Sequence, residues 1–248
     1  AFLPQRGILR NGDVLAADIL ELLEVELRRA LADAVEVEPF LGLSIAEEFV
    51  VAVAPPQPGK VVAHARRRIA QCLANLPKHK IIGMGGALDS ARFKYRLAEA
   101  LECPISDVDG MVIGGHSDKG MVPLINKETR NGVQVSEFLS AERMEEVVQA
   151  TKVGGATLTG LLGTSAWYAP GAAVSGLVQA IACDQKKMFP CSTLLDGEFG
   201  LSDLCIGVPV ILGKNGIEKI VEISLTDAEK AKMQESAEGV KATNGLLA

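Results

Sequence analysis

The chain has 248 residues, which is enough for one large domain or two small ones with a sizeable buried core. Its hydrophobic fraction of 48% and charged fraction of 23% are ordinary for a globular protein, and its net charge of −6 argues against a nucleic-acid partner. No apolar run approaches the ~20 residues of a membrane span, and the five cysteines form no C-x-x-C pair, so we expect no membrane partner, no metal site and a reducing, cytoplasmic location.

The first third of the chain predicts alternating helices and strands. Residues 14–34, rich in Leu, Ala and Glu, predict a helix, and residues 61–73 predict a second one. Between them, the apolar run at 49–54 predicts a buried strand that the following prolines stop. Residues 80–84 predict another strand, followed by a glycine-rich turn and a helix over about 89–101. This order is typical of an α/β unit.

The middle of the chain predicts short strands followed by helices. The expected elements are strands at 112–114, 121–125 and 133–135 and helices at 140–153 and 157–182. Gly154 and Gly155 are expected to interrupt the first helix. The second helix is expected to break near residues 169–171, which include a proline and a glycine.

Strands gather in the last part of the chain before a final helix. They are expected at 189–195, 204–212 and 219–224, with turns at 196–197 and 214–216. Thr226 and Glu229 have the spacing of a capping box, which predicts the start of a C-terminal helix that ends near 244–245. The whole order predicts an α/β unit followed by an α+β region.

Three side chains in two short segments carry the chemistry. Asp89 and Arg92 stand one helical turn apart, so both can point at one site, and His116 follows a predicted strand and a glycine pair. An acid beside an imidazole fixes its tautomer and stabilises the imidazolium, and a guanidinium binds a carboxylate through two hydrogen bonds. The set suits a site that holds a 2-keto acid and moves a proton onto its carbonyl, while a cofactor supplies the hydride. Taken singly, Asp89 is more often a helix cap and His116 a turn residue, and these interpretations stay open.

Five segments match a known pattern in order and spacing. They are LPKHKIIGMGGALDSARF at 76–93, VIGGHSD at 112–118, GTSAWYAP at 163–170, FPC at 189–191 and IGVPV at 206–210. From residue 76 onward the chain therefore resembles the lactate/malate dehydrogenase family, in particular its lactate-dehydrogenase-like bacterial group of malate dehydrogenases. The resemblance implies a remnant of a Rossmann-type nucleotide-binding domain over 1–80 and a catalytic, substrate-binding domain over 81–248.

The resemblance also implies a reaction and residue roles. The reaction is the NAD-dependent, reversible oxidation of (S)-malate to oxaloacetate in the tricarboxylic acid cycle, carried out by a homodimer or homotetramer. His116 would donate and accept the proton, Asp89 would be its partner, and Arg92 would hold the carboxylate of the dicarboxylate substrate. Ser165 lies in the segment that the family places against the substrate.

The first third departs from the family pattern. Residues 3–10 are faintly similar to the family's mobile loop: Arg10 fits the arginine that polarises the carbonyl, and Gln5 or Arg6 falls where the other substrate-binding arginine stands. The G-x-G-x-x-G loop that cradles the pyrophosphate of NAD is absent, so no cofactor-binding residue is assigned. Residues 83–86 are rejected as that loop because they belong to the segment that carries Asp89.

Three alternatives follow from these departures. Gln5 motivates a lactate dehydrogenase-like 2-hydroxy acid dehydrogenase, and the missing phosphate loop motivates a catalytically inactive substrate-domain fragment. The abrupt change in similarity at residue 76 motivates the hypothesis that residues 1–75 do not represent the natural family sequence, which intact-mass measurement with peptide sequencing would test.

Overall fold

The computed structural model describes residues 50–52, 77–163 and 168–245. Their strands are β1 (Val50–Ala52), β2 (Ile81–Gly83), β3 (Val112–Gly114), β4 (Met121–Pro123), β5 (Thr129–Arg130), β6 (Val133–Gln134), β7 (Lys187–Asp196), β8 (Ser202–Gly213) and β9 (Gly216–Ile220). Their α-helices are α4 (Gly85–Ala100), α5 (Ala141–Leu162), α6 (Tyr168–Ala182) and α7 (Asp227–Asn244). The predicted helices at 14–34 and 61–73 lie outside the described residues.

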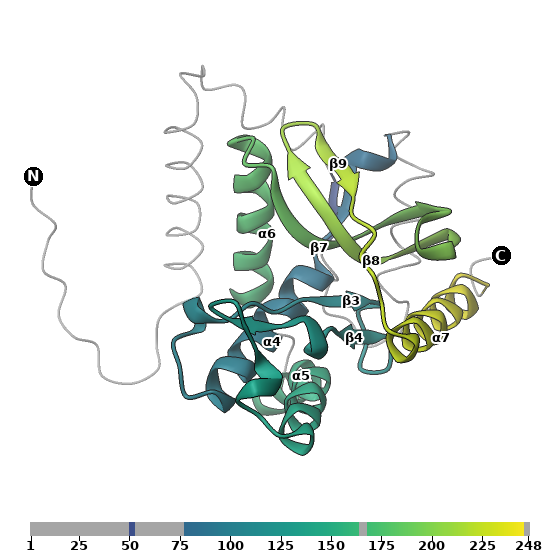
Figure 1. The fold of residues 1–248 in the computed structure, drawn as a ribbon. Helices are drawn as coiled ribbons and strands as arrows, with labels where there is room; N and C mark the ends of the chain where they lie inside the picture. The colour runs from purple at the N-terminus through teal and green to yellow at the C-terminus, as the bar shows by residue number, and fades with distance from the viewer. Residues whose placement is uncertain (1–49, 53–76, 164–167, 246–248) are drawn as a thin grey trace, which may run out of the picture.

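A mixed seven-stranded sheet organises these elements. Its order is β1-β2-β7-β8-β3-β4, with β9 paired to β8, and β5 and β6 form a separate two-stranded sheet. β1 is parallel to β2, and the other pairs are antiparallel. Figure 1 shows α4 and α5 side by side near β3, α6 against β8, and α7 beside β8, β3 and β4. The combination of a mixed sheet and helices confirms the predicted fold class.

Several local signals have the predicted outcome. β1 lies within the predicted strand at 49–54, and the tight turn after β8 pairs Gly213 directly with Gly216. Because pairing resumes at once after that turn, β9 covers 216–220 and the prediction of a strand over 219–224 is wrong in its position. The Thr226 side chain accepts a hydrogen bond from Glu229 N, and the Glu229 carboxylate accepts one from Thr226 N, which confirms the capping box of α7.

The predicted helix boundaries around glycines and prolines are wrong. α5 continues through the glycine pair at 154–155 and ends at Gly163, whose φ of 67° is the left-handed conformation that glycine adopts without cost. The break predicted near 169–171 lies earlier in the chain: Leu162 is the last residue of α5 and α6 begins at Tyr168, so Pro170 lies in the first turn of α6. A proline fits there because the first amides of a helix have no helical acceptor.

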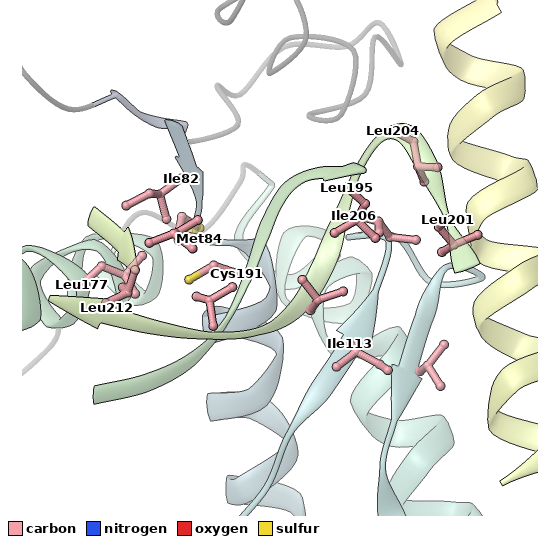
Figure 2. Packing of buried hydrophobic residues seen from close by; sticks show 14 of the residues in the cluster. Ile82, Met84, Ile113, Leu177, Cys191, Leu195, Leu201, Leu204, Ile206 and Leu212 are labelled. Carbon is pink, nitrogen blue, oxygen red and sulfur yellow. The ribbon is translucent and has the colours of Figure 1, made fainter. Parts of the chain in front are cut away.

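The buried hydrophobic residues form two clusters. The larger one joins the sheet to α6 and α7, and Figure 2 shows Ile82, Leu177, Cys191 and Leu212 gathered from β2, α6, β7 and β8, with Ile206 farther along beside Leu195. The smaller one fixes α4 against β3, β4 and α5; its members include Phe93, Leu97, Val112, Met121 and Val147. α4 is therefore packed between two cores, which makes it a rigid platform for polar side chains.

In the described part of the chain, no helix combines the length and apolar character needed to cross a membrane. The proposed domain boundary after residue 80 stays a prediction.

Candidate active site

One buried carboxylate holds the two other predicted site residues together. The Asp89 Oδ2 atom lies 2.7 Å from His116 Nδ1, and Asp89 Oδ1 accepts a hydrogen bond of 3.2 Å from Arg92 Nη1. The Asp89 side chain is 2% exposed, whereas those of Arg92 and His116 are 22% and 26% exposed. The carboxylate is thus removed from water, and its two basic partners lie between it and the surface.

Asp89 is not a helix cap, so that interpretation is wrong. α4 begins at Gly85 rather than near residue 89, and Met84 occupies the N-cap position without a side-chain hydrogen bond. Asp89 is the fifth residue of the helix and is 1% exposed. Its carboxylate is directed to side chains instead of the free amides of the first turn, which supports a role in the site rather than in starting the helix.

The glycines at the start of α4 are needed for close packing. A Cβ atom on Gly85 would lie 2.7 Å from His116 Cγ, and one on Gly86 would lie 2.7 Å from the carbonyl oxygen of Pro190. Both distances are shorter than side-chain contacts allow, so only glycine fits. The Gly85 contact brings the imidazole against the helix that carries Asp89.

His116 comes from a short turn between β3 and β4. The turn begins after Gly114, which has a φ of +88° and where an added Cβ would collide with the carbonyl oxygen of Gly120. The Gly120 amide donates to both the Ser117 carbonyl and Ser117 Oγ, at 2.9 and 3.0 Å. These contacts make the loop compact and place His116 above the first turn of α4.

Arg92 has a second neighbour that the sequence did not identify. A Cβ on Gly155 of α5 would lie 3.2 Å from Arg92 Nη1, so the guanidinium packs directly on the backbone of that helix. The glycine pair at 154–155 had been expected to interrupt α5. The sequence shows the two glycines, but only the structure shows that one of them leaves room for Arg92.

A cavity of about 1030 Å³ opens beside Arg92. Its walls come from α4, α5, α6, the start of β7 and the segments around 109–111 and 124–128, which include Glu128. Arg92 lines it, but Asp89 and His116 do not. Proton transfer needs the paired groups and not the larger space, so the chemistry belongs to the Asp89–His116 contact rather than to the cavity.

Residues 86–244 match the family model for the lactate/malate dehydrogenase, alpha/beta C-terminal domain. The chain belongs to the lactate/malate dehydrogenase family. This segment includes all three clustered residues, and it confirms the resemblance drawn from the sequence.

Curated relatives of this family are named malate dehydrogenase. The chain is 63% identical over 172 residues to the protein of Bacteroides thetaiotaomicron, which is 69% of this chain and 55% of that protein. It is 57% identical over the same length to the protein of Flavobacterium johnsoniae. The chain therefore spans about half the length of these relatives.

Solved structures of the family have the same fold. The malate dehydrogenase of Salinibacter ruber aligns with a TM-score of 0.76 at 36% identity, covering 92% of this chain and 71% of that one. The lactate dehydrogenase of Eimeria maxima with NADH and oxamate aligns with a TM-score of 0.73 at 35% identity, covering 76% and 58%.

The structure does not describe the remaining predicted site residues. Arg6, Arg10 and Ser165 lie outside the described residues, so their roles stay predictions. Across residues 50–52, 77–163 and 168–245, no three His, Cys, Asp or Glu side chains are grouped as metal ligands.

A second buried carboxylate, Glu128, was not predicted. It is 4% exposed, and its Oε1 accepts a hydrogen bond of 2.9 Å from Met111 N. Burial raises the pKa of Glu128 from 4.5 to about 7, a shift that the Met111 amide only partly opposes. Because this burial comes from tertiary packing, no local pattern in the sequence announces it.

Proposed function

We propose that the chain provides the proton-transfer and carboxylate-binding part of a malate dehydrogenase site, which interconverts (S)-malate and oxaloacetate. The observation that carries this proposal is the single buried carboxylate of Asp89, which contacts both His116 and Arg92. A homodimer or homotetramer, as the family resemblance implies, is part of the same proposal.

His116 exchanges the proton in this proposal. Since Asp89 engages Nδ1, the imidazole meets the substrate through Nε2. In malate oxidation, Nε2 takes the proton of the C2 hydroxyl as the carbonyl forms, and the Asp89 carboxylate stabilises the resulting imidazolium. In oxaloacetate reduction, the same atom returns the proton to the carbonyl oxygen.

Arg92 binds and orients the substrate. Its guanidinium has five N–H donors, of which one at Nη1 is directed to Asp89, so the group can form two parallel hydrogen bonds to a substrate carboxylate. A lysine would supply only a point charge. Because Arg92 and His116 share Asp89 as a partner, the bound carboxylate and the reacting oxygen are held at related positions.

The family's nicotinamide cofactor supplies or accepts the hydride of the reaction, and a related lactate dehydrogenase and a related malate dehydrogenase have been solved in complex with NADH. The junction of β2 and α4 does not fit the cofactor's pyrophosphate. The junction of β2 and α4 has the strand, glycines and helix of a dinucleotide loop, but His116 and the Pro190 carbonyl fill the space against its glycines. We therefore assign no residue to the cofactor.

The test is the oxidation of NADH by oxaloacetate in the presence of the full chain, followed by the loss of NADH absorbance. We expect turnover in the parent and a kcat lower by about 10²- to 10⁴-fold in His116→Gln, with oxamate binding retained. Equal activity in the variant would contradict the proton role. Comparing rates on oxaloacetate and pyruvate separates the malate dehydrogenase from the lactate dehydrogenase-like alternative.

A second candidate is a substrate-binding domain without turnover. It is favoured by the filled junction of β2 and α4, which leaves the described residues without a dinucleotide cradle. Fluorescence of NADH titrated with the chain distinguishes the two candidates. A chain that binds NADH and turns over supports the enzyme. A chain that binds oxamate but does not bind NADH supports the substrate-binding domain.

A further inference from the structure

A serine of the last helix reaches the turn that carries His116. Ser236 lies on α7 and is 4% exposed. Its Oγ accepts a hydrogen bond from Gly115 N and donates one to the carbonyl oxygen of Gly120, both at 2.8 Å. The two bonds connect segments more than a hundred residues apart in the sequence.

The two groups bound by Ser236 are the two ends of the turn. Gly115 N also donates to the Gly120 carbonyl at 3.0 Å, so the hydroxyl completes a three-membered set of hydrogen bonds at the base of the loop. Because a hydroxyl accepts and donates at once, it restrains the base in two directions. His116 is the first residue beyond this base, so its backbone direction follows from it.

The serine is not explained by the packing of α7. The neighbouring buried positions of that helix are occupied by Met233, Ala237 and Val240. A buried hydroxyl loses its hydrogen bonds to water, and serine is a weaker helix former than alanine. The hydrogen bonds to the turn therefore account for a hydroxyl at this position.

Two helices hold the histidine: α4 contacts its imidazole ring, and α7 binds the backbone of its turn. Asp89 Oδ2 lies 2.7 Å from Nδ1, and the backbone of Gly85 leaves the ring no room for an added Cβ. Both contacts come from α4. Ser236 connects the backbone of the histidine turn to the other helix, α7.

We infer that Ser236 is a positioning residue for His116, acting through the turn and not through the substrate. This inference rests on the proposed function. Ser236 holds the base of the turn so that the imidazole meets both Asp89 and the reacting oxygen. The loop would keep its fold without this hydroxyl, since the Gly115–Gly120 bond remains, but the ring would sample a wider range of orientations.

The first measurement uses Ser236→Ala in the full chain. We expect kcat for oxaloacetate reduction to fall about tenfold while KM stays within about twofold, because proton transfer depends on orientation and Arg92 is untouched. Val240→Ala is the matched control, because it loosens the same face of α7 and keeps the hydroxyl. An equal loss of kcat in the control would overturn the inference. If Ser236→Ala does not fold, Ser236→Cys keeps the shape of the side chain with a somewhat larger atom and supplies only a weak hydrogen bond, so the same fall in kcat is expected and an unchanged kcat would overturn the inference.

The second measurement asks whether Ser236 acts through His116. In a His116→Gln background, which retains slow turnover, Ser236→Ala should change kcat by less than about twofold. A tenfold loss in that background would show a general structural effect and overturn the inference.

Amide hydrogen exchange makes the inference independent of turnover. Exchange at residues 115–120 should accelerate in Ser236→Ala, while that of α4 stays unchanged. Unchanged exchange at the turn would overturn the inference even in an active enzyme. A parent chain without turnover would instead overturn the proposed function, and it would do so before any Ser236 variant is made.

Discussion

Asp89 and Glu128 are both buried carboxylates, and they differ in their partners. Asp89 is 1% exposed and contacts the imidazole of His116 and the guanidinium of Arg92. Glu128 is 4% exposed and has one backbone amide, that of Met111, as its hydrogen-bond donor. The two buried acids therefore differ in what surrounds them: two basic side chains at Asp89 and a backbone amide at Glu128.

The difference shows what burial alone does to a carboxylate. At Glu128 the loss of hydration is the largest influence, and the nearby charge of Asp109 adds to it, so the pKa rises to about 7 despite Lys94. At Asp89 the partners are basic groups that can both serve a substrate. A buried carboxylate is therefore informative about function when its partners are side chains able to react or bind.

The largest expected effect separates the two acids by activity. Asp89→Asn keeps the shape of the side chain but removes its charge, so the imidazolium loses its stabilising partner, and we expect kcat to fall about 10³-fold. Glu128→Gln makes the same chemical change at the other acid and should leave kcat within about twofold. Steady-state assays of both variants test this, and a large loss in Glu128→Gln would break the comparison.

The next effect separates them by stability. Because the pKa of Glu128 is raised from 4.5 to about 7 on folding, the native state binds the proton more tightly than the unfolded chain. The free energy of unfolding should therefore fall as the pH rises from 4.5 to about 7 and stay lower above that, by on the order of 3 kcal/mol for this group.

Glu128→Gln should remove that decline, since its amide oxygen still accepts from Met111 N without any charge to bury. Urea unfolding at pH 5 and pH 8 measures it. A variant that is no more stable than the parent at pH 8 would show that the Glu128 carboxylate is accommodated in its charged form.

A third effect sharpens the role of the partners of Asp89. Arg92→Lys removes the two-bond geometry, so KM for oxaloacetate should rise about tenfold to hundredfold. Arg96→Lys is the matched control, because Arg96 is on the same helix and pairs with the exposed Glu99 at 2.8 Å. An unchanged KM in Arg92→Lys would exclude the carboxylate clamp.

The smallest effect concerns the helix behind Arg92. Gly155→Ala would place a Cβ 3.2 Å from Nη1 and displace the guanidinium slightly, so KM should rise about threefold to fivefold. Gly160→Ala has nothing within 4 Å of its new Cβ and should instead stabilise α5 by about 0.5–1 kcal/mol with KM unchanged. Thermal unfolding and initial rates on the pair give both numbers, and equal KM values would mean that Arg92 does not depend on this packing.

Local rules predicted much of the fold. The strands at 112–114 and 189–195, the capping box of α7 and the turn at 214–216 each depend on residues within one turn or one hairpin, and each is present. The predicted helix start near Asp89 and the interruption of α5 fail for one shared reason. Both rest on glycines whose neighbours lie far away in the sequence.

For the site, the sequence by itself determined that Asp89 and Arg92 share a helix face, because their spacing is one helical turn. It also singled out His116 from its place after a predicted strand and a glycine pair, and the family resemblance implied its role. Only the tertiary structure decided that one carboxylate contacts both partners, that Gly155 makes room for Arg92, that Ser236 holds the histidine turn and that Glu128 is buried. The physical reason is that burial and close contact depend on which distant segment packs opposite a residue, and a local pattern in the chain does not record its neighbour.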